Sequence, residues 1–163
     1  MSDNAYDILK QRGFVAQVTD EAAVRAHLNE NEVTFYIGFD STAGSLHAGS
    51  LVTIMAMMHL QRAGHKPIGL VGGGTTMVGD PSGKTEMRQL LTRAKIEAYG
   101  QKIHAQLNQY LHFDQGLAIA ENNASWLLEL NYLSFLRDIG RHFSVNRMLA
   151  AEAYKQRLER GLS

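Results

Sequence analysis

The sequence contains no cysteine and only two prolines in its 163 residues. The absence of cysteine excludes both a disulfide framework and a thiolate metal site. Sixteen basic side chains balance sixteen acidic ones, so there is no global positive field to hold a nucleic acid, although charge can still gather locally. The seven histidines show no zinc-like spacing, and we expect no structural metal. Without a long apolar run, we expect a cytoplasmic protein with no membrane contact.

What the sequence does contain is typical of a globular protein. Apolar residues make up 45% of the chain and charged residues 20%, which is ordinary usage. A chain of this length can bury roughly 70% of its unfolded surface around one core. There is no internal repeat, low-complexity tract or interdomain linker. Composition therefore favours one folded domain.

Residues 33–51 are the most informative stretch. Residues 33–39 are β-branched and aromatic, which favours a buried strand. Turn formers follow at residues 40–45, and residues 49–60 are apolar almost all round, which predicts a helix buried on most of its surface. His47 lies just before this helix or in its first turn. A helix that begins after a parallel strand offers free N–H groups to a phosphate, so the geometry suggests a nucleotide.

Strands and helices alternate along the rest of the chain, which indicates an α/β fold. A polar loop is expected over residues 75–84, and an interruption near Thr92 could divide the helix that follows it. The first two strands and the helix between them should form a right-handed parallel crossover unit. We expect strands at 33–39, 67–71 and 117–120 and helices at 3–11, 20–28, 49–64, 86–110, 126–130, 133–140 and 144–158.

Two common nucleotide motifs do not fit. Residues 79–84, Gly-Asp-Pro-Ser-Gly-Lys, end like a P-loop, but the first glycine of that motif should stand at position 78, which is valine. Residues 72–74 are three glycines, but a dinucleotide-binding fingerprint needs another glycine at position 77, which is methionine. Both alternatives are therefore weak.

A third motif fits better. Residues 47–50 read His-Ala-Gly-Ser and follow Gly-Phe-Asp-Ser-Thr at residues 38–42. This string resembles the HIGH signature of class I aminoacyl-tRNA synthetases. With Tyr36 two residues before Gly38, the sequence of this motif is similar to that of the tyrosyl-tRNA synthetases. Residues 72–88 and 135–148 are also similar to this family.

The resemblance assigns roles to several polar residues. Tyr36 would bind the phenolic oxygen of tyrosine and Asp80 its α-ammonium group, since a carboxylate matches an ammonium ion. Asp40 and Gly38 would line the junction between tyrosine and nucleotide.

Other residues would face ATP. His47 would stabilise the phosphate charge of the activation transition state, with Thr42 beside it. Gly49 would let adenine approach the backbone closely, Ser50 would donate a hydrogen bond to the nucleotide, and Thr53 would lie near the ribose.

Lys84 and Arg88 would meet the pyrophosphate, because two cations match the charge that develops on a leaving group. Asn123 and Trp126 belong to a string that is typical of the family, but a turn former and a core aromatic are the simpler interpretations.

The resemblance also implies the architecture and the activity. The fold would be a Rossmann-like parallel sheet flanked by helices and truncated after its first half, with residues 1–32 a helical segment and residues 33–163 a partial catalytic domain. The longer enzyme would be a tyrosine–tRNA ligase that uses ATP with Mg²⁺ to make tyrosyl-adenylate, transfers tyrosine to tRNA(Tyr) and forms a homodimer, with no tightly bound cofactor. The present chain alone would be inactive. The alternative is a non-catalytic module of the same fold that binds tyrosine, a nucleotide or RNA.

Overall fold

The computed structural model describes residues 4–78, 91–150, 154–155 and 158. The chain divides into two compact units, residues 1–125 and residues 126–163. The first unit contains α1 (Ala5–Gln11), α2 (Glu21–Glu30), β1 (Thr34–Asp40), α3 (Ala48–Arg62), β2 (Lys66–Gly72), α4 (Gly73–Val78), α5 (Arg93–Leu107), a 3₁₀ turn (Asp114–Gly116) and β3 (Ile119–Asn122). α6 (Ala124–Leu127) spans the boundary, and the second unit contains α7 (Tyr132–Asp138), a 3₁₀ turn (Gly140–His142) and α8 (Val145–Leu149).

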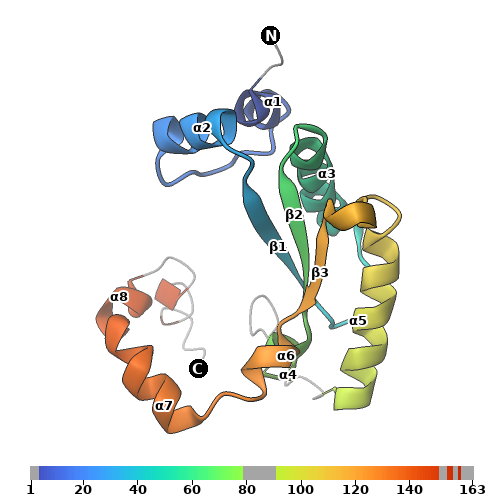
Figure 1. The fold of residues 1–163 in the computed structure, drawn as a ribbon. Helices are drawn as coiled ribbons and strands as arrows, with labels where there is room; N and C mark the ends of the chain where they lie inside the picture. Colours follow the sequence, from blue (N-terminus) through green and yellow to red (C-terminus); the bar gives the residue numbers. More distant parts are fainter. Residues whose placement is uncertain (1–3, 79–90, 151–153, 156–157, 159–163) are drawn as a thin grey trace. The chain divides into compact units, whose positions relative to one another are not determined.

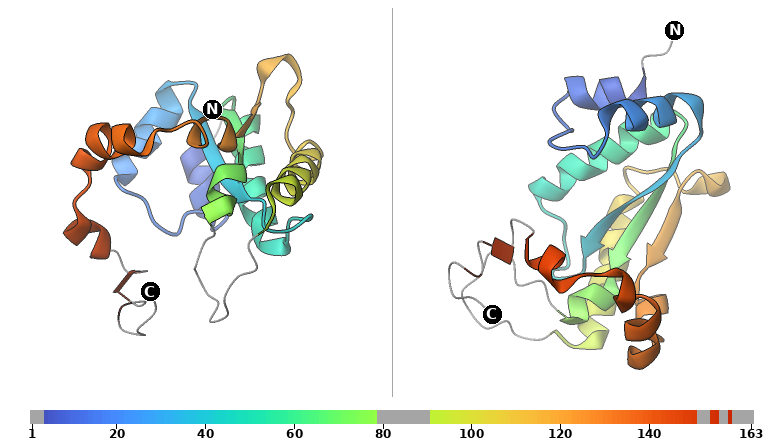
Figure 2. Two further views of the ribbon diagram at one scale, coloured as in Figure 1. Left: turned by 90° about the horizontal axis from the view of Figure 1, so that it is seen from below. Right: turned by 90° about the vertical axis from the view of Figure 1, so that its left-hand side faces the viewer.

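The three strands form a parallel sheet in the order β1-β2-β3. Figures 1 and 2 show the three arrows side by side and pointing the same way. The register pairs Tyr36 with Ile68, which pairs in turn with Ile119. The predicted α/β class and the parallel unit formed by β1, α3 and β2 are confirmed. The first two strands lie within one residue of their predicted bounds, but β3 begins two residues later than predicted.

One face of the sheet builds the hydrophobic core. The odd-numbered side chains of β1 from Phe35 to Phe39 contact this core, whereas Tyr36, Gly38 and Asp40 at the even-numbered positions are exposed. This alternation follows from the period of two in a β-strand. The buried members of the core come from β1, α3, β2, α5 and the turn after α5: Phe39, Ile54, Met57, Val71, Ile103, Leu107 and Leu111.

Local signals set the ends of the helices. Asp20 caps α2 by accepting a hydrogen bond from the Ala23 N–H at 2.9 Å. α3 ends just before Gly64, whose φ of +93° lies in the left-handed region that glycine tolerates. α1 and α2 are joined on their exposed faces by Asp7 with Arg25 and by Lys10 with Glu21. The hydrogen bond from Arg25 lowers the pKa of the Asp7 carboxyl.

His65 joins the beginnings of β1 and β2. Its side chain is 5% exposed, and its Nδ1 accepts a hydrogen bond from the Val33 N–H at 3.3 Å. The adjacent Lys66 N–H bonds the Val33 carbonyl at 2.9 Å. Burial lowers the pKa of His65, because the charged imidazolium is poorly solvated in this position.

The structure corrects one expectation for the segment after β2 and agrees with another. Residues 75–78, expected in a polar loop, belong to α4, which starts directly after β2 because the Asn123 side chain binds its first amides. α5 starts at Arg93 because the Thr92 side chain caps it, which agrees with the interruption expected near Thr92. Residues 79–90 lie outside the described residues, so the rest of the predicted loop and helix start does too.

α3 is less buried than its apolar sequence predicts. Ile54 and Met57 are buried, but Leu51 is 40% exposed and Val52 is 54% exposed. The reason is that α3 packs on the sheet with one side. The expectation of burial on most of its surface is therefore wrong for the first turn of this helix.

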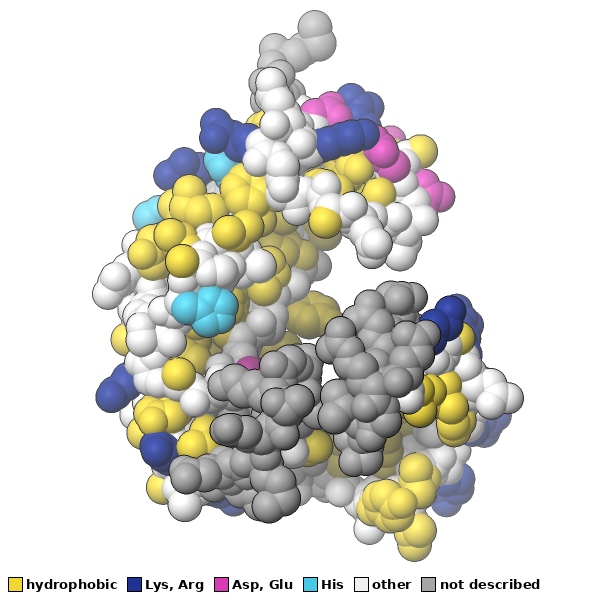
Figure 3. Space-filling view, turned by 180° about the vertical axis from the view of Figure 1, so that it is seen from behind, with side chains coloured by type: hydrophobic (Ala, Val, Ile, Leu, Met, Phe, Trp, Pro, Cys, Tyr) yellow, Lys and Arg dark blue, Asp and Glu magenta, His cyan; other side chains and the backbone are white. Residues whose placement is uncertain are grey.

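The second unit also exposes apolar side chains. Trp126, predicted to be a core aromatic, is 44% exposed. α7 matches its prediction closely, whereas α8 covers only Val145–Leu149 of the helix predicted over residues 144–158. Hydrophobic side chains, yellow in Figure 3, reach the surface of both units. None of the helices in the part of the chain that the structure describes has the length and apolarity to span a membrane.

Candidate functional site

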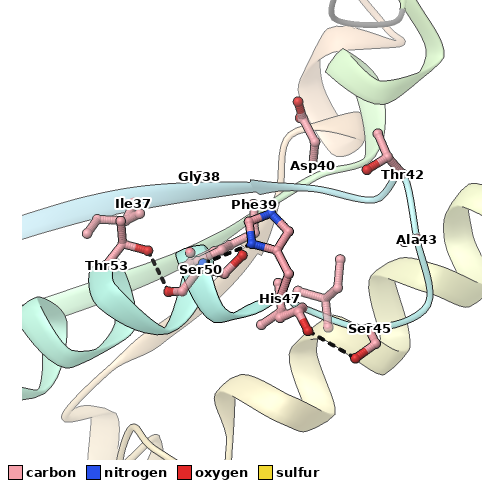
Figure 4. Close-up of a pocket in the computed structure, with 13 residues that line it drawn as sticks. Ile37, Gly38, Phe39, Asp40, Thr42, Ala43, Ser45, His47, Ser50 and Thr53 are labelled. Carbon is pink, nitrogen blue, oxygen red and sulfur yellow. Dashed lines mark hydrogen bonds between the residues drawn. The ribbon is translucent and has the colours of Figure 1, made fainter. Parts of the chain in front are cut away.

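A pocket of about 350 Å³ lies where β1 ends and α3 begins. Figure 4 shows the chain leaving β1, crossing residues 41–46 and entering α3 at His47, so that strand, loop and helix surround one space. Its lining residues are Ile37, Gly38, Phe39, Asp40, Thr42, Ala43, Ser45, Leu46, His47, Gly49, Ser50, Thr53 and Ile103. The carboxyl end of a parallel strand is the usual position for a ligand in an α/β sheet.

This pocket brings together most of the residues that the sequence singles out for ATP. Gly38 and Asp40 come from the end of β1, and Thr42 comes from the loop. His47 with Gly49, Ser50 and Thr53 comes from the beginning of α3. Eleven sequence positions separate Gly38 from Gly49, yet the chain reversal between them places both residues on one pocket.

His47 is the N-cap of α3, as the sequence predicts. Its Nδ1 accepts a hydrogen bond from the Ser50 N–H at 3.3 Å, and its backbone carbonyl accepts from the same N–H at 2.9 Å. Because Nδ1 uses its lone pair in this cap, the neutral ring carries its proton on Nε2. The exposed His47 ring therefore offers an Nε2–H donor to the pocket.

Asp40 is held by a chain of polar side chains. Thr75 in α4 donates a hydrogen bond from Oγ1 to Oδ1 of Asp40 at 2.9 Å. Asn123, which is buried, donates from Nδ2 to Thr75 Oγ1 at 3.2 Å. Oδ1 of Asn123 accepts from the Gly74 N–H at 2.7 Å and lies 3.4 Å from the Thr75 N–H. Asn123 thus fixes the start of α4 and, through Thr75, the direction of the Asp40 carboxylate.

This arrangement requires a glycine at position 72. A Cβ at Gly72 would lie 2.2 Å from Oδ1 of Asp40 and 2.7 Å from Oγ1 of Thr75. Distances this short are not tolerated, so any larger residue would have to displace the carboxylate. The close approach of β2 to the Asp40 side chain explains the first glycine of the 72–74 run.

Of the remaining predicted site residues, the structure describes only Tyr36. Tyr36 is on the same exposed face of β1 as Gly38 and Asp40, is 68% exposed and is not among the residues that line the pocket. Asp80, Lys84 and Arg88 lie outside the described residues. The described part of the chain holds no cluster of three or more metal-ligating side chains.

Sequence reasoning missed two residues that organise the site. The sequence predicts a loop without a role at Thr75 and favours a simple turn former at Asn123. One signal could have found Asn123, because it directly follows the third parallel strand and polar groups at that end of a sheet collect around the ligand site.

Comparison with known proteins gives a consistent picture. The family model described as tRNA synthetases class I (W and Y) matches residues 28–163. A tyrosine–tRNA ligase from Lachnoclostridium phytofermentans is 58% identical over all 163 residues, which correspond to 40% of the relative. One from Syntrophus aciditrophicus is 63% identical over 160 residues, which make up 98% of this chain and 37% of the relative. The chain thus spans about two fifths of the length of these relatives.

Solved structures show the same likeness. A C-terminally truncated mitochondrial tyrosyl-tRNA synthetase from Aspergillus nidulans superposes with a TM-score of 0.85 and 27% identity, covering 99% of this chain and 49% of that one. The corresponding protein from Coccidioides posadasii gives a TM-score of 0.79 and 26% identity, covering 98% and 46%.

Proposed function

This chain belongs to the family of class I tRNA synthetases (W and Y), and we propose that it supplies part of the catalytic domain of a tyrosine–tRNA ligase. In that reaction the tyrosine carboxylate attacks the α-phosphorus of ATP. One P–O bond forms to the carboxylate, the P–O bond to pyrophosphate breaks, and tyrosyl-adenylate then passes its tyrosyl group to tRNA(Tyr). The observation that carries the proposal is that Asp40, Thr42 and His47, at the start of α3, line the same pocket.

His47 would stabilise the reacting phosphate. Its Nε2–H is the donor left after Nδ1 caps α3, and the positive end of a 15-residue helix lies beside it. The Thr42 hydroxyl lines the same pocket and would add a second donor. A preorganised donor that meets developing charge typically contributes about 3 kcal/mol to a transition state.

The exposed face of β1 would hold tyrosine. Tyr36, Gly38 and Asp40 follow one another along this face, with about 6.6 Å between successive positions. Nothing lies within 4 Å of the position that a Cβ on Gly38 would occupy, so a ligand can lie flat on the strand there. The phenol would meet Tyr36 at one end, and the junction with the nucleotide would meet Asp40 at the other.

Several parts of the proposal extend beyond the described residues. Asp80 would bind the α-ammonium group, and Lys84 with Arg88 would bind pyrophosphate. Within the described residues, Gly49 would face adenine, with Ser50 and Thr53 nearby on the same pocket. Mg²⁺ would arrive with ATP, because it is commonly held by substrate phosphates rather than by a protein cage.

The domain assignment and the partners are also part of the proposal. Residues 1–32 would form the helical segment and residues 33–163 part of the Rossmann-like catalytic domain, in a homodimeric cytoplasmic enzyme that acts on tRNA(Tyr). Because the chain corresponds to 40% of a relative and the tyrosine face of β1 is open, we expect residues 1–163 alone to lack activity.

A substitution that separates the two ring nitrogens of His47 tests the proposal. The test protein is a graft in which residues 1–163 replace the matched part of the Lachnoclostridium phytofermentans relative. In His47→Asn the short amide can still cap α3 but cannot reach the position of Nε2. We expect the kcat for tyrosine-dependent ATP–pyrophosphate exchange to fall roughly 10²–10³-fold, with little change in thermal stability.

The control for this test is His27→Asn, which changes an exposed histidine of α2 far along the chain from the pocket. It should retain full exchange. Equal rates in the His47→Asn and His27→Asn grafts would contradict the role given to His47. A folded graft with no exchange at all would contradict the proposed function.

A further inference from the structure

The loop between β1 and α3, residues 41–47, carries five of the residues that line the pocket, among them Thr42 and His47, but has little backbone support of its own. Within the described chain, no backbone–backbone hydrogen bond holds residues 42–46. The loop must nevertheless place Thr42 and His47 on one pocket. Side chains from other elements therefore have to determine its conformation.

Two side chains supply the missing hydrogen bonds, one at each end of the loop. Thr76 in α4 accepts a hydrogen bond from the buried Ser41 N–H at 2.8 Å. At the other end, Gln106 in the last turn of α5 accepts from the Leu46 N–H at 3.0 Å. Leu46 directly precedes His47, so this second bond is adjacent to the proposed phosphate donor.

The Gln106 amide has both of its donor positions and its acceptor oxygen occupied. Its Nε2 donates to the carbonyl oxygens of Gly44 at 3.4 Å and Lys102 at 3.2 Å. Its Oε1 faces the Leu46 N–H and lies 3.5 Å from the Ser45 hydroxyl. The bond to Lys102, one turn back in α5, fixes the amide relative to its own helix. The bonds to Gly44 and Leu46 then fix the loop relative to that helix.

Packing supports the same contact. A Cβ at Gly44 would lie 3.3 Å from the ring of Tyr99 and 3.4 Å from the Lys102 side chain. The loop therefore lies directly against the face of α5 that presents Gln106. Ile103, one turn before Leu107 on this helix, lines the pocket itself. The loop thus packs against α5, which determines its position.

From this geometry we propose that Gln106 is a positioning residue for activation: it sets the loop conformation that places Thr42 and His47 for the reacting phosphate. This inference rests on the proposed function. Gln106 is not among the residues that line the pocket, although it lines a neighbouring cavity together with Leu46 and His47. We therefore assign it an action through its hydrogen bond to Leu46 and not through contact with ATP or tyrosine. Loss of such positioning by about 1 Å can lower a rate roughly 100-fold.

Three variants test the inference. Gln106→Leu removes both loop bonds while keeping a side chain of similar size. Gln106→Glu keeps an acceptor for the Leu46 N–H but cannot donate to Gly44, so it should restore part of the loss. The matched control is Gln101→Leu on the same helix, where the side chain is exposed and lines a different cavity beside β3.

The first readout needs no enzymatic activity. Amide hydrogen exchange at Leu46 is followed by NMR in the 163-residue chain, where the Leu46 N–H is bonded to Gln106. We expect exchange at Leu46 to be at least about 10-fold faster in Gln106→Leu than in the parent or in Gln101→Leu. Unchanged exchange at Leu46 would overturn the inference, whether or not the proposed function holds.

The second readout is ATP–pyrophosphate exchange in the graft. We expect Gln106→Leu to lower kcat roughly 10- to 100-fold with less than about a twofold change in KM for tyrosine. Gln106→Glu should lie between it and the parent. A kcat equal to that of Gln101→Leu would overturn the inference, as would a change confined to KM. If the parent graft is silent while Leu46 exchange responds as expected, the proposed function fails and the loop contact stands.

Discussion

Gly72 offers a sharp test of the Asp40 arrangement, because an added methyl group would meet a functional side chain. In Gly72→Ala the new Cβ would lie 2.2 Å from Oδ1 of Asp40, 2.7 Å from Oγ1 of Thr75 and 3.2 Å from the Cα of Asp40. The first two atoms can rotate away, but the third belongs to the backbone of the paired strand. The substitution must therefore break the bond between Thr75 and Asp40 and strain the β1–β2 pairing.

The cost can be worked out from these contacts. A hydrogen bond to a charged acceptor contributes about 1.5–3 kcal/mol, and overpacking costs about 1–3 kcal/mol. The exposed Asp40 carboxylate can turn into water, which favours the lower ends of both ranges. Alanine also lowers the conformational entropy of the unfolded chain, which stabilises the folded state by about 0.4–1 kcal/mol. We expect Gly72→Ala to lower the free energy of unfolding by about 2 kcal/mol.

Urea unfolding of the 163-residue chain, followed by far-UV circular dichroism, measures this difference. With a slope of about 2 kcal/mol per molar urea, the midpoint should fall by about 1 M. Gly38→Ala is the control, because a Cβ there would meet nothing within 4 Å on the neighbouring strand. It should leave the midpoint unchanged or raise it slightly. Equal midpoints for the two variants would refute the account of Gly72.

Two further predictions concern buried polar groups. Burial lowers the pKa of His65 in the folded chain, while the unfolded value is about 6.5; stability should therefore be full above about pH 6.5 and fall as the pH drops through the lowered pKa. His65→Leu should make the free energy of unfolding, measured by urea titration between pH 5 and 8, less dependent on pH. The same pH dependence in His65→Leu and the parent would contradict this role of His65. Asn123→Ala leaves the backbone N–H groups of Gly74 and Thr75 without their side-chain acceptor. It should lower the free energy of unfolding by about 2–3 kcal/mol. A loss below 1 kcal/mol in the same urea assay would show that water replaces the Asn123 amide.

Much of the fold could be predicted from local patterns in the sequence. The strand and turn signals over residues 33–47 predicted both β1 and the position of His47 at the start of α3, because periodicity and capping are local properties. The resemblance at residues 47–50 then indicated the family. The secondary structure and the family motif could both be predicted because each depends only on residues that are neighbours in the sequence.

What the sequence could not show depends on contacts between distant segments. α4 was missed because its first amides are bound by Asn123, which lies 49 residues beyond Gly74. The part played by Gln106 was missed for the same reason, since it meets Leu46 across 60 residues. The exposure of Leu51 could not be seen either, because apolar character alone does not tell which side of a helix the sheet covers.

The most direct test of the proposed function compares two amino acids in the ATP–pyrophosphate exchange assay. The graft carrying residues 1–163 is assayed with tyrosine and with tryptophan, because the family model spans both kinds of enzyme, and the 163-residue chain is assayed alongside. We predict exchange in the graft with tyrosine only, and none from the 163 residues alone. Exchange driven equally by tryptophan, or a folded graft that fails to exchange with tyrosine, would contradict the proposal.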